Sequence, residues 1–169
     1  MSEASILTQN FGIIGTILQD MAIFLGVGMT LAALFQFKKY GEQRTMMSSQ
    51  HSIAGPLAML IAGASLLVLP TFIDTALYAF WKNSNPLTYS GDTSGWGSLV
   101  PPILMLVRLV GVGSFIRGIV MISRCGAQQS QPGQLGKAMM HIFAGILCVH
   151  ILGTLHLLKN ILGFTTGKN

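Results

Sequence analysis

Two arginines lie within one apolar stretch of this sequence, where a charged side chain is unfavourable and needs a chemical explanation. Residues 105–124, MLVRLVGVGSFIRGIVMISR, contain Arg108 and Arg117. An arginine near the centre of a membrane-spanning helix costs about 2.5–3.5 kcal/mol, so each needs an anionic partner, an aqueous path or access to headgroups. Their spacing places them on opposite faces of a helix, so they cannot line one surface together.

Asp74 is the carboxylate closest to Arg108 in predicted depth. Counted from the outer ends of their segments, the two differ in depth by only about 3 Å at 1.5 Å per residue. We therefore hypothesise a buried Asp74–Arg108 ion pair, which would either pin two helices together or line an aqueous path. Arg117 lies near the end of its segment and is expected to reach the headgroups together with Arg124.

The histidines raise the question of a proton relay, because His141, His150 and His156 all lie on the last apolar segment. His141 and His150 face opposite sides of a helix, and no Asp or Glu lies on that segment to complete a relay or a metal site. Packing or interface roles are the better interpretation. Cys125 and Cys148 are too few for a disulfide framework.

The motifs of common enzyme classes do not occur in this chain. We find no HExxH, no CxxC pair, no glycine-rich phosphate loop after a strand and no nucleophile elbow. The sequence therefore predicts a protein that is not an enzyme and holds no metal or cofactor, with bound phospholipid as the only non-protein component that it allows for. The net charge of +5 is spread over several loops and one helix, so direct nucleic-acid binding is not expected.

Composition predicts an all-α integral membrane protein. Hydrophobic residues make up 51% of the 169 residues and charged residues 9%, and the mean hydropathy is +0.61. Once the apolar stretches are set aside, nothing remains for a soluble domain, so residues 1–169 form a single membrane domain. The start of the chain has an acidic residue, Glu3, where a signal peptide has basic ones, so the first apolar segment is expected to be retained.

Four apolar runs are long enough to cross a bilayer. They are predicted at about residues 17–37, 53–81, 99–122 and 138–158, with a kink near Pro70 in the second run. Residues 1–20 show apolar positions at helical spacing and predict an amphipathic N-terminal segment. An interfacial helix and a continuous bent helix running into the first span fit this segment equally well.

Lysine and arginine in the short loops predict the orientation. Lys38, Lys39 and Arg44 lie in one loop, and Arg124 and Lys137 in another, so both loops are expected on the cytoplasmic side. The N- and C-termini of this multi-pass protein are then expected on the opposite side, which is the periplasm if the membrane is the bacterial inner membrane that the resemblance given below implies.

Small residues recur where helices could approach closely, and in lipid such close approach must supply the preference for helix contact. The predicted packing positions are Gly28, Ala32, Ala58, Ala62, Gly111, Gly113, Gly118, Gly145 and Gly153. Packing within one subunit is the simpler interpretation, with packing between subunits as the alternative.

Three stretches of the chain are similar to a known family. YGEQRTMMSSQHSIAGPLAMLIAGASLLVLPTFIDT, VGSFIRGIVMISRCG and QPGQLGKAMMHIFAGILCVHILGTLHLLKNILGF lie between Tyr40 and Phe164. Together they resemble the IcmC/DotE family of the Dot/Icm type IVB secretion system and its conjugative-plasmid counterpart TraQ. Relatives tend to have asparagine in the later part of the last span, where this chain has His150 and His156.

The resemblance implies a small structural subunit of a machine that exports effector proteins or transfers DNA between bacteria. The expected partners are membrane lipid and other membrane subunits of the apparatus, in a homo- or hetero-oligomer. Two alternatives remain open. One is a pilin-like subunit of a conjugative filament assembled with lipid, and the other is an ion or solute channel subunit with Arg108 and Asp74 in its path.

Overall fold

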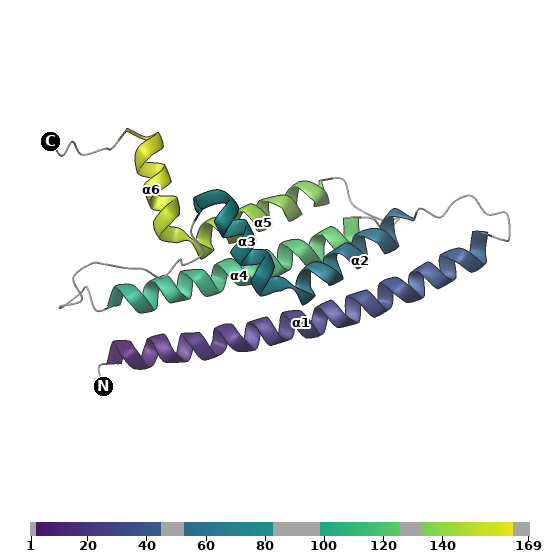
Figure 1. Cartoon of the computed structure of the whole chain (residues 1–169), viewed down its shortest axis with the longest axis horizontal. Coiled ribbons are helices and arrows are strands. Elements are labelled where there is room, and N and C mark those ends of the chain that lie inside the picture. The colour runs from purple at the N-terminus through teal and green to yellow at the C-terminus, as the bar shows by residue number, and fades with distance from the viewer. Residues whose placement is uncertain (1–2, 45–52, 83–98, 126–132, 164–169) are drawn as a thin grey trace.

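The computed structural model describes residues 3–44, 53–82, 99–125 and 133–163, and within these ranges the chain forms six α-helices and no strand. This confirms the predicted all-α class. The helices, shown in Figure 1, are α1 (Glu3–Arg44), α2 (Ala54–Leu67), α3 (Leu69–Trp81), α4 (Val100–Cys125), α5 (Gln134–Val149) and α6 (Ile151–Ile161). Residues 45–52, 83–98 and 126–132 and the C-terminal tail, on which part of the orientation prediction rests, lie outside the described residues.

Two of the described helices, α1 and α4, are long and apolar enough to cross a membrane by themselves. The other predicted spans are bent pairs: α2 and α3 meet at 87°, and α5 and α6 at 99°. By length and composition, the described part of the chain thus has two helices that could cross a membrane, or up to four such spans if each bent pair is one span. The fourth predicted run, 138–158, contains a sharp turn at His150 that the sequence did not predict.

The two breaks have different chemical causes. The first falls at Val68, and Pro70 occupies the first turn of α3, where its missing N–H costs nothing. The predicted kink near Pro70 is thus present two residues earlier. No proline marks the second break; instead the His150 side chain accepts a hydrogen bond from the N–H of Gly153 and caps the start of α6.

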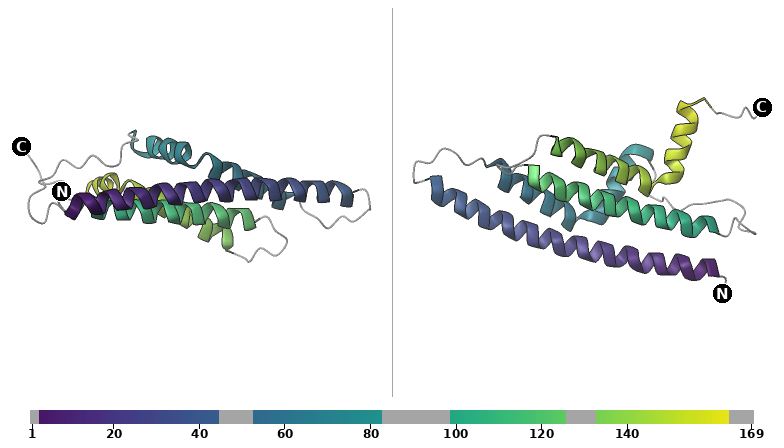
Figure 2. Two further views of the ribbon diagram at one scale, coloured as in Figure 1. Left: turned by 90° about the horizontal axis from the view of Figure 1, so that it is seen from below. Right: turned by 180° about the vertical axis from the view of Figure 1, so that it is seen from behind.

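Helix α1 runs without interruption from Glu3 to Arg44. Of the two alternatives for the N-terminal segment, the structure has the continuous helix, which curves gently along the whole molecule (Figures 1 and 2). The predicted first span is the middle part of this helix.

The helices form two antiparallel hairpins that lie side by side in the same direction. α1 pairs with α2, and α4 pairs with α5, while α1 and α4 run parallel to each other (Figure 1). α3 and α6 each turn away from the hairpin that precedes them, as the view from behind in Figure 2 shows for α6. The basic ends of α1 and α4 point to the same end of the bundle.

In both hairpins, the two helices contact each other through the same set of backbone atoms. A Cβ added to Gly26 of α1 would meet Gly63 O at 2.9 Å and Leu67 N at 3.0 Å on α2. A Cβ added to Gly111 of α4 would meet Gly145 O and Val149 N, both at 2.9 Å, on α5. In each hairpin, therefore, a glycine of the first helix lies directly against the backbone of the second.

The contact is reciprocal in both hairpins. A Cβ on Gly63 would meet Thr30 N at 2.9 Å and Gly26 O at 3.1 Å, and a Cβ on Gly145 would meet Phe115 N at 2.9 Å and Gly111 O at 2.8 Å. Each hairpin thus has glycine facing glycine, and side chains at either position would force the helices apart.

Short sequence matches accompany this structural repeat. Gly26-Val27-Gly28 of α1 corresponds to Gly111-Val112-Gly113 of α4, and Ala62-Gly63 of α2 corresponds to Ala144-Gly145 of α5. In both hairpins the break follows five residues after the second glycine, at Val68 and at His150. The membrane domain is therefore built as a tandem repeat of one hairpin unit.

The second hairpin is displaced along the helix axis relative to the first. A Cβ on Gly15 of α1 would lie 3.8 Å from Leu109 Cδ1 of α4, so these two residues lie beside each other. The position on α4 that corresponds to Gly15 in the repeat is Val100, nine residues before Leu109. The displacement is therefore about nine residues, or roughly 14 Å at 1.5 Å per residue.

A single apolar core joins the hairpins. Phe115, Leu66, Leu69 and Leu77 are its largest fully buried side chains, and the ring of Phe115 packs 5.6 Å from that of Phe72 of α3. Side chains from α1 to α5 contribute to this core, so the hairpins fold against each other as one unit.

The predicted packing residues divide into two groups. Ala62, Gly111, Gly118 and Gly145 are buried, and the three glycines lie against a neighbouring helix. Gly28 is exposed, and a Cβ there would meet nothing within 4 Å, so its prediction as a packing position within the chain is wrong.

The remaining predicted positions make looser or different contacts. Gly113 approaches only Leu18, at 4.0 Å, and Gly153 packs against the side chains of His150 and Trp81. Ala32 and Ala58 are half-buried.

Large apolar side chains cover much of the outer surface. On α1, Phe24 is 80% exposed and Phe35 72%, and on α5 Met140 is 69% exposed. Soluble proteins rarely expose continuous apolar faces of this length, so this surface fits lipid or neighbouring helices.

Gly111→Ala is expected to destabilise the fold, whereas Gly28→Ala is not. The new methyl group at position 111 would collide with the backbone of α5, and overpacking of this kind costs about 1–3 kcal/mol. At position 28 alanine meets open space and should stabilise the helix by about 0.5–1 kcal/mol. The fraction of monodisperse protein remaining after heating in detergent measures both effects, and equal behaviour of the two variants would contradict the glycine contact.

Candidate functional site

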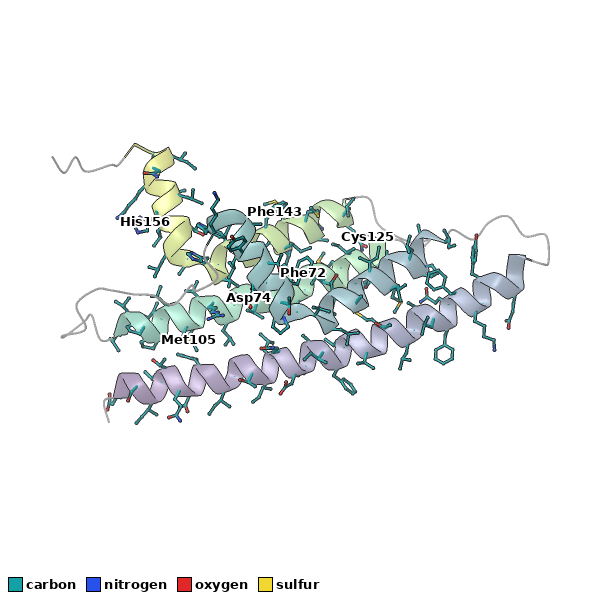
Figure 3. All side chains as sticks on the ribbon, in the orientation of Figure 1. Phe72, Asp74, Met105, Cys125, Phe143 and His156 are labelled. Carbon is teal, nitrogen blue, oxygen red and sulfur yellow. The ribbon has the colours of Figure 1, made fainter. Side chains whose placement is uncertain are left out.

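A polar cavity of about 280 Å³ opens between α1, α3 and α4. Figure 3 shows Asp74 on α3 and Met105 on α4, both over the N-terminal half of α1. The cavity exists because Gly12 and Gly15 of α1 leave room opposite Met105 and Leu109 of α4. Its wall combines four polar side chains with apolar ones, and its lining residues are Phe11, Gly12, Gly15, Thr16, Gln19, Leu69, Pro70, Ile73, Asp74, Met105, Arg108, Leu109 and Val112.

Arg108 and Asp74 both line this cavity, as their predicted depth suggested, but they do not form the predicted buried ion pair. An ion pair of the described residues, Lys38–Glu42 at 3.9 Å, lies instead on the exposed end of α1. Asp74 is exposed and Arg108 is half-buried, and the two charges act on each other electrostatically without direct contact. The break at Val68 explains the difference, because it turns α3 by 87° away from the line of α2.

The guanidinium of Arg108 therefore lies beside apolar side chains, and the carboxylate of Asp74 is too far away to contact it. Thr16 does not help, because its hydroxyl donates to Gly12 O at 3.2 Å on its own helix. Gln19 adds an amide to the same wall. The cavity can therefore hold a polar group, above all an anionic one, between Arg108 and the neighbouring helices.

Arg117 is exposed on α4 and is not among the residues that line this cavity. The two arginines of the same helix thus have different surroundings. The expectation that Arg117 reaches the headgroups stays a prediction.

His150 has a structural position that the sequence did not indicate. Its ring stacks on Trp81 with centroids 4.8 Å apart and 7° between the planes, and its Nδ1 accepts the Gly153 N–H at 2.9 Å. The side chain is 8% exposed, and its Nε2 is buried with no hydrogen-bond partner among the described residues. His150 therefore ties the end of α3 to the break between α5 and α6.

The other two histidines lie elsewhere. His141 Nδ1 lies 2.8 Å from Lys137 O on its own helix and donates to this carbonyl, and His156 is exposed on α6, well away from α5 in Figure 3. In the part of the chain that the structure describes, no three His, Cys, Asp or Glu side chains are grouped as a metal site would need. Cys125 and Cys148 are both free thiols.

The chain matches no protein-family model, no curated protein and no solved structure. Its functional assignment therefore depends on its own residues and geometry.

Neutralising Asp74 and Arg108 should have effects that do not add. Asp74→Asn and Arg108→Gln each remove one of two charges that share a cavity, so their interaction energy should be about 0.5–1 kcal/mol. Thermal unfolding of the single and double variants in detergent measures this energy. Asp20→Asn combined with Arg108→Gln is the control and should be additive, because Asp20 does not line the cavity. Strict additivity for Asp74 and Arg108 would show that the two charges are independent.

His150→Ala should destabilise the isolated chain, because it removes the cap of α6 and the stack on Trp81. Loss of a helix cap alone costs about 0.5–2 kcal/mol. His156→Ala, at an exposed position, should change stability by no more than about 0.5 kcal/mol. The same heating assay compares the two, and an unchanged His150→Ala variant would mean that the break at residue 150 does not depend on this ring.

Proposed function

We propose that this chain is a structural inner-membrane subunit of a bacterial type IVB secretion or conjugation apparatus. In this role it has no catalytic site of its own and supports the translocation of effector proteins or DNA–protein complexes. The resemblance of residues 40–164 to the IcmC/DotE family suggests the machine. The observation that carries the proposal is the open apolar face of α1, with Phe24 and Phe35 projecting outward, which offers a surface to neighbouring membrane subunits.

The rigidity of the hairpins supports a scaffold role. In each hairpin the glycine contacts bring two helix backbones together, and across α4 and α5 Ser114 Oγ donates to His141 O at 3.2 Å. Between α1 and α2, Gln36 Nε2 donates to Met59 Sδ at 3.2 Å. Such interhelical polar contacts fix the relative positions of helices in lipid.

The cavity at Arg108 gives the scaffold a polar contact point. A guanidinium without a direct carboxylate partner among the described residues can bind a carboxylate from a neighbouring subunit or a lipid phosphate. Either would lower the energy of keeping Arg108 at this depth.

Deletion and co-purification in the native host test this function. Loss of the chain should abolish effector export or plasmid transfer while leaving growth unchanged, and the wild-type gene should restore it. The tagged chain, extracted from native membranes with mild detergent, should carry other envelope subunits of the apparatus. Unchanged transfer in the deletion strain, with the chain migrating alone, would contradict the proposal.

A second candidate, a pilin-like subunit of a filament assembled with lipid, is favoured by one observation. The second hairpin is displaced by roughly 14 Å along the helix axis relative to the first, as calculated from the helix rise. Units that repeat with an axial displacement extend naturally as a helix rather than as a flat ring.

Sheared extracellular material distinguishes the two candidates. A filament that contains this chain would support the pilin, whereas a discrete complex that stays in the solubilised envelope would support the apparatus subunit. Electron microscopy of both fractions gives the answer.

A further inference from the structure

The outer face of α1 corresponds, position by position, to a face of α4 that is covered inside the chain. On α4 this face packs against the first hairpin: Met105 lies opposite Gly12, Leu109 opposite Gly15, and Gly113 opposite Leu18. Its members are buried or half-buried, and they are Met105, Arg108, Leu109, Val112, Gly113, Ile116 and Ile119.

The corresponding positions on α1 are uncovered. Six of the seven are exposed and one is half-buried, and they are Asp20, Ile23, Phe24, Val27, Gly28, Leu31 and Leu34. We call this set the α1 outer face. Phe24 is 80% exposed where its counterpart Leu109 packs on α1.

The second hairpin has the complementary surface, and this is also open. Ala62 of α2 is 2% exposed in the core between the hairpins, whereas its counterpart Ala144 of α5 is exposed. Leu18 of α1 packs on Gly113 of α4, whereas its counterpart Ile103 of α4 is 57% exposed. The two surfaces that meet between the hairpins therefore each occur twice in the molecule. One copy of each is buried between the hairpins, and the other copy is exposed, on α1 and on the second hairpin respectively.

We propose that a second copy of this chain docks its α1 outer face onto the second hairpin of the first, repeating the hairpin–hairpin interface between molecules. The interface is heterologous, so the docked pair keeps one open face at each end and accepts further copies. This inference rests on the contacts within the chain and is independent of the machine to which the protein belongs.

Charge supports the choice of a second copy as the occupant. In the repeat, Asp20 takes the place of Met105 and His156 takes the place of Asp74, two residues that line one cavity inside the chain. Asp20 and His156 are both exposed, and neither forms an ion pair or a hydrogen bond in the described part of the chain. Docking would bring the carboxylate of one molecule toward the imidazole of the other.

The repeat predicts which residues of two docked copies contact each other. Since Leu18 contacts Gly113 within the chain, Ile103 of one molecule must contact Gly28 of the next. Gly28 is open to a large neighbouring side chain, because it has nothing within 4 Å of an added Cβ.

Cysteine cross-linking in native membranes tests this contact. In a background with Cys125→Ser and Cys148→Ala, two differently tagged copies carry Ile103→Cys and Gly28→Cys respectively, and copper phenanthroline oxidises them. We expect about tenfold more mixed dimer than from Ile103→Cys with Leu25→Cys, an exposed position outside the α1 outer face, because only close cysteines can bridge. Leu18→Cys with Gly113→Cys in one chain is the positive control and should form an internal bridge.

A second variant separates assembly from folding. Gly28→Trp should leave the monomer folded but shift the extracted protein to the size of a single chain, whereas Gly136→Trp, which also meets nothing within 4 Å, should keep the oligomer. If lipid or an unrelated subunit covers the α1 outer face, the control pair at positions 18 and 113 should still form its internal disulfide, whereas the pair at positions 103 and 28 should form no mixed dimer. That result would overturn the proposal.

Discussion

Close contact between two helix backbones at facing glycines is the interaction on which the rest of this structure depends. In lipid, apolar side chains gain little by leaving the solvent for another helix, so helix pairing has to come from dense packing and polar contacts between backbones. Gly26 against Gly63 and Gly111 against Gly145 provide that packing. Because both hairpins use the same contact, the position of every other element follows from where these four glycines lie.

The cavity at Arg108 is a consequence of how the hairpins meet. Had the second hairpin lain level with the first, Val100 and not Leu109 would lie beside Gly15, and Arg108 would face a different part of α1. The axial displacement brings Arg108 opposite residues with small or polar side chains. The break at Val68 then places Asp74 at the rim of the same cavity without letting it reach the guanidinium. Asp74 therefore offsets only part of the cost of placing the Arg108 cation among apolar side chains, and the surroundings of the cavity must offset the rest.

The sequence allowed the helical class, the apolar segments and the shared location of Asp74 and Arg108 to be predicted, because hydropathy and depth depend on local composition. It did not indicate the break at His150, since no proline marks it and the cap arises from a ring that also stacks on a distant Trp81. Gly26 and Gly63 were not predicted for another reason: small residues at helical spacing indicated Gly28 instead, two positions away on a different face of α1. The repeated Gly-Val-Gly and Ala-Gly pairs mark the region of the hairpin contact, but Gly28 belongs to the same repeated triplet, so only the structure shows that Gly26 and not Gly28 faces α2.

The repeat of the hairpin unit also explains why one side of this molecule is so apolar. A hairpin that packs head-to-tail on neighbours of its own kind needs two different faces, one for the preceding hairpin and one for the following hairpin. Fusing two such units covers one pair of faces and leaves the other pair open, one on α1 and one on the second hairpin. The exposure of Leu31 and Leu34 beside the burial of their counterparts Ile116 and Ile119 is what this arrangement predicts. A face exposed to lipid alone needs only to be apolar, whereas the α1 outer face also keeps a glycine at the position where its covered counterpart receives a side chain.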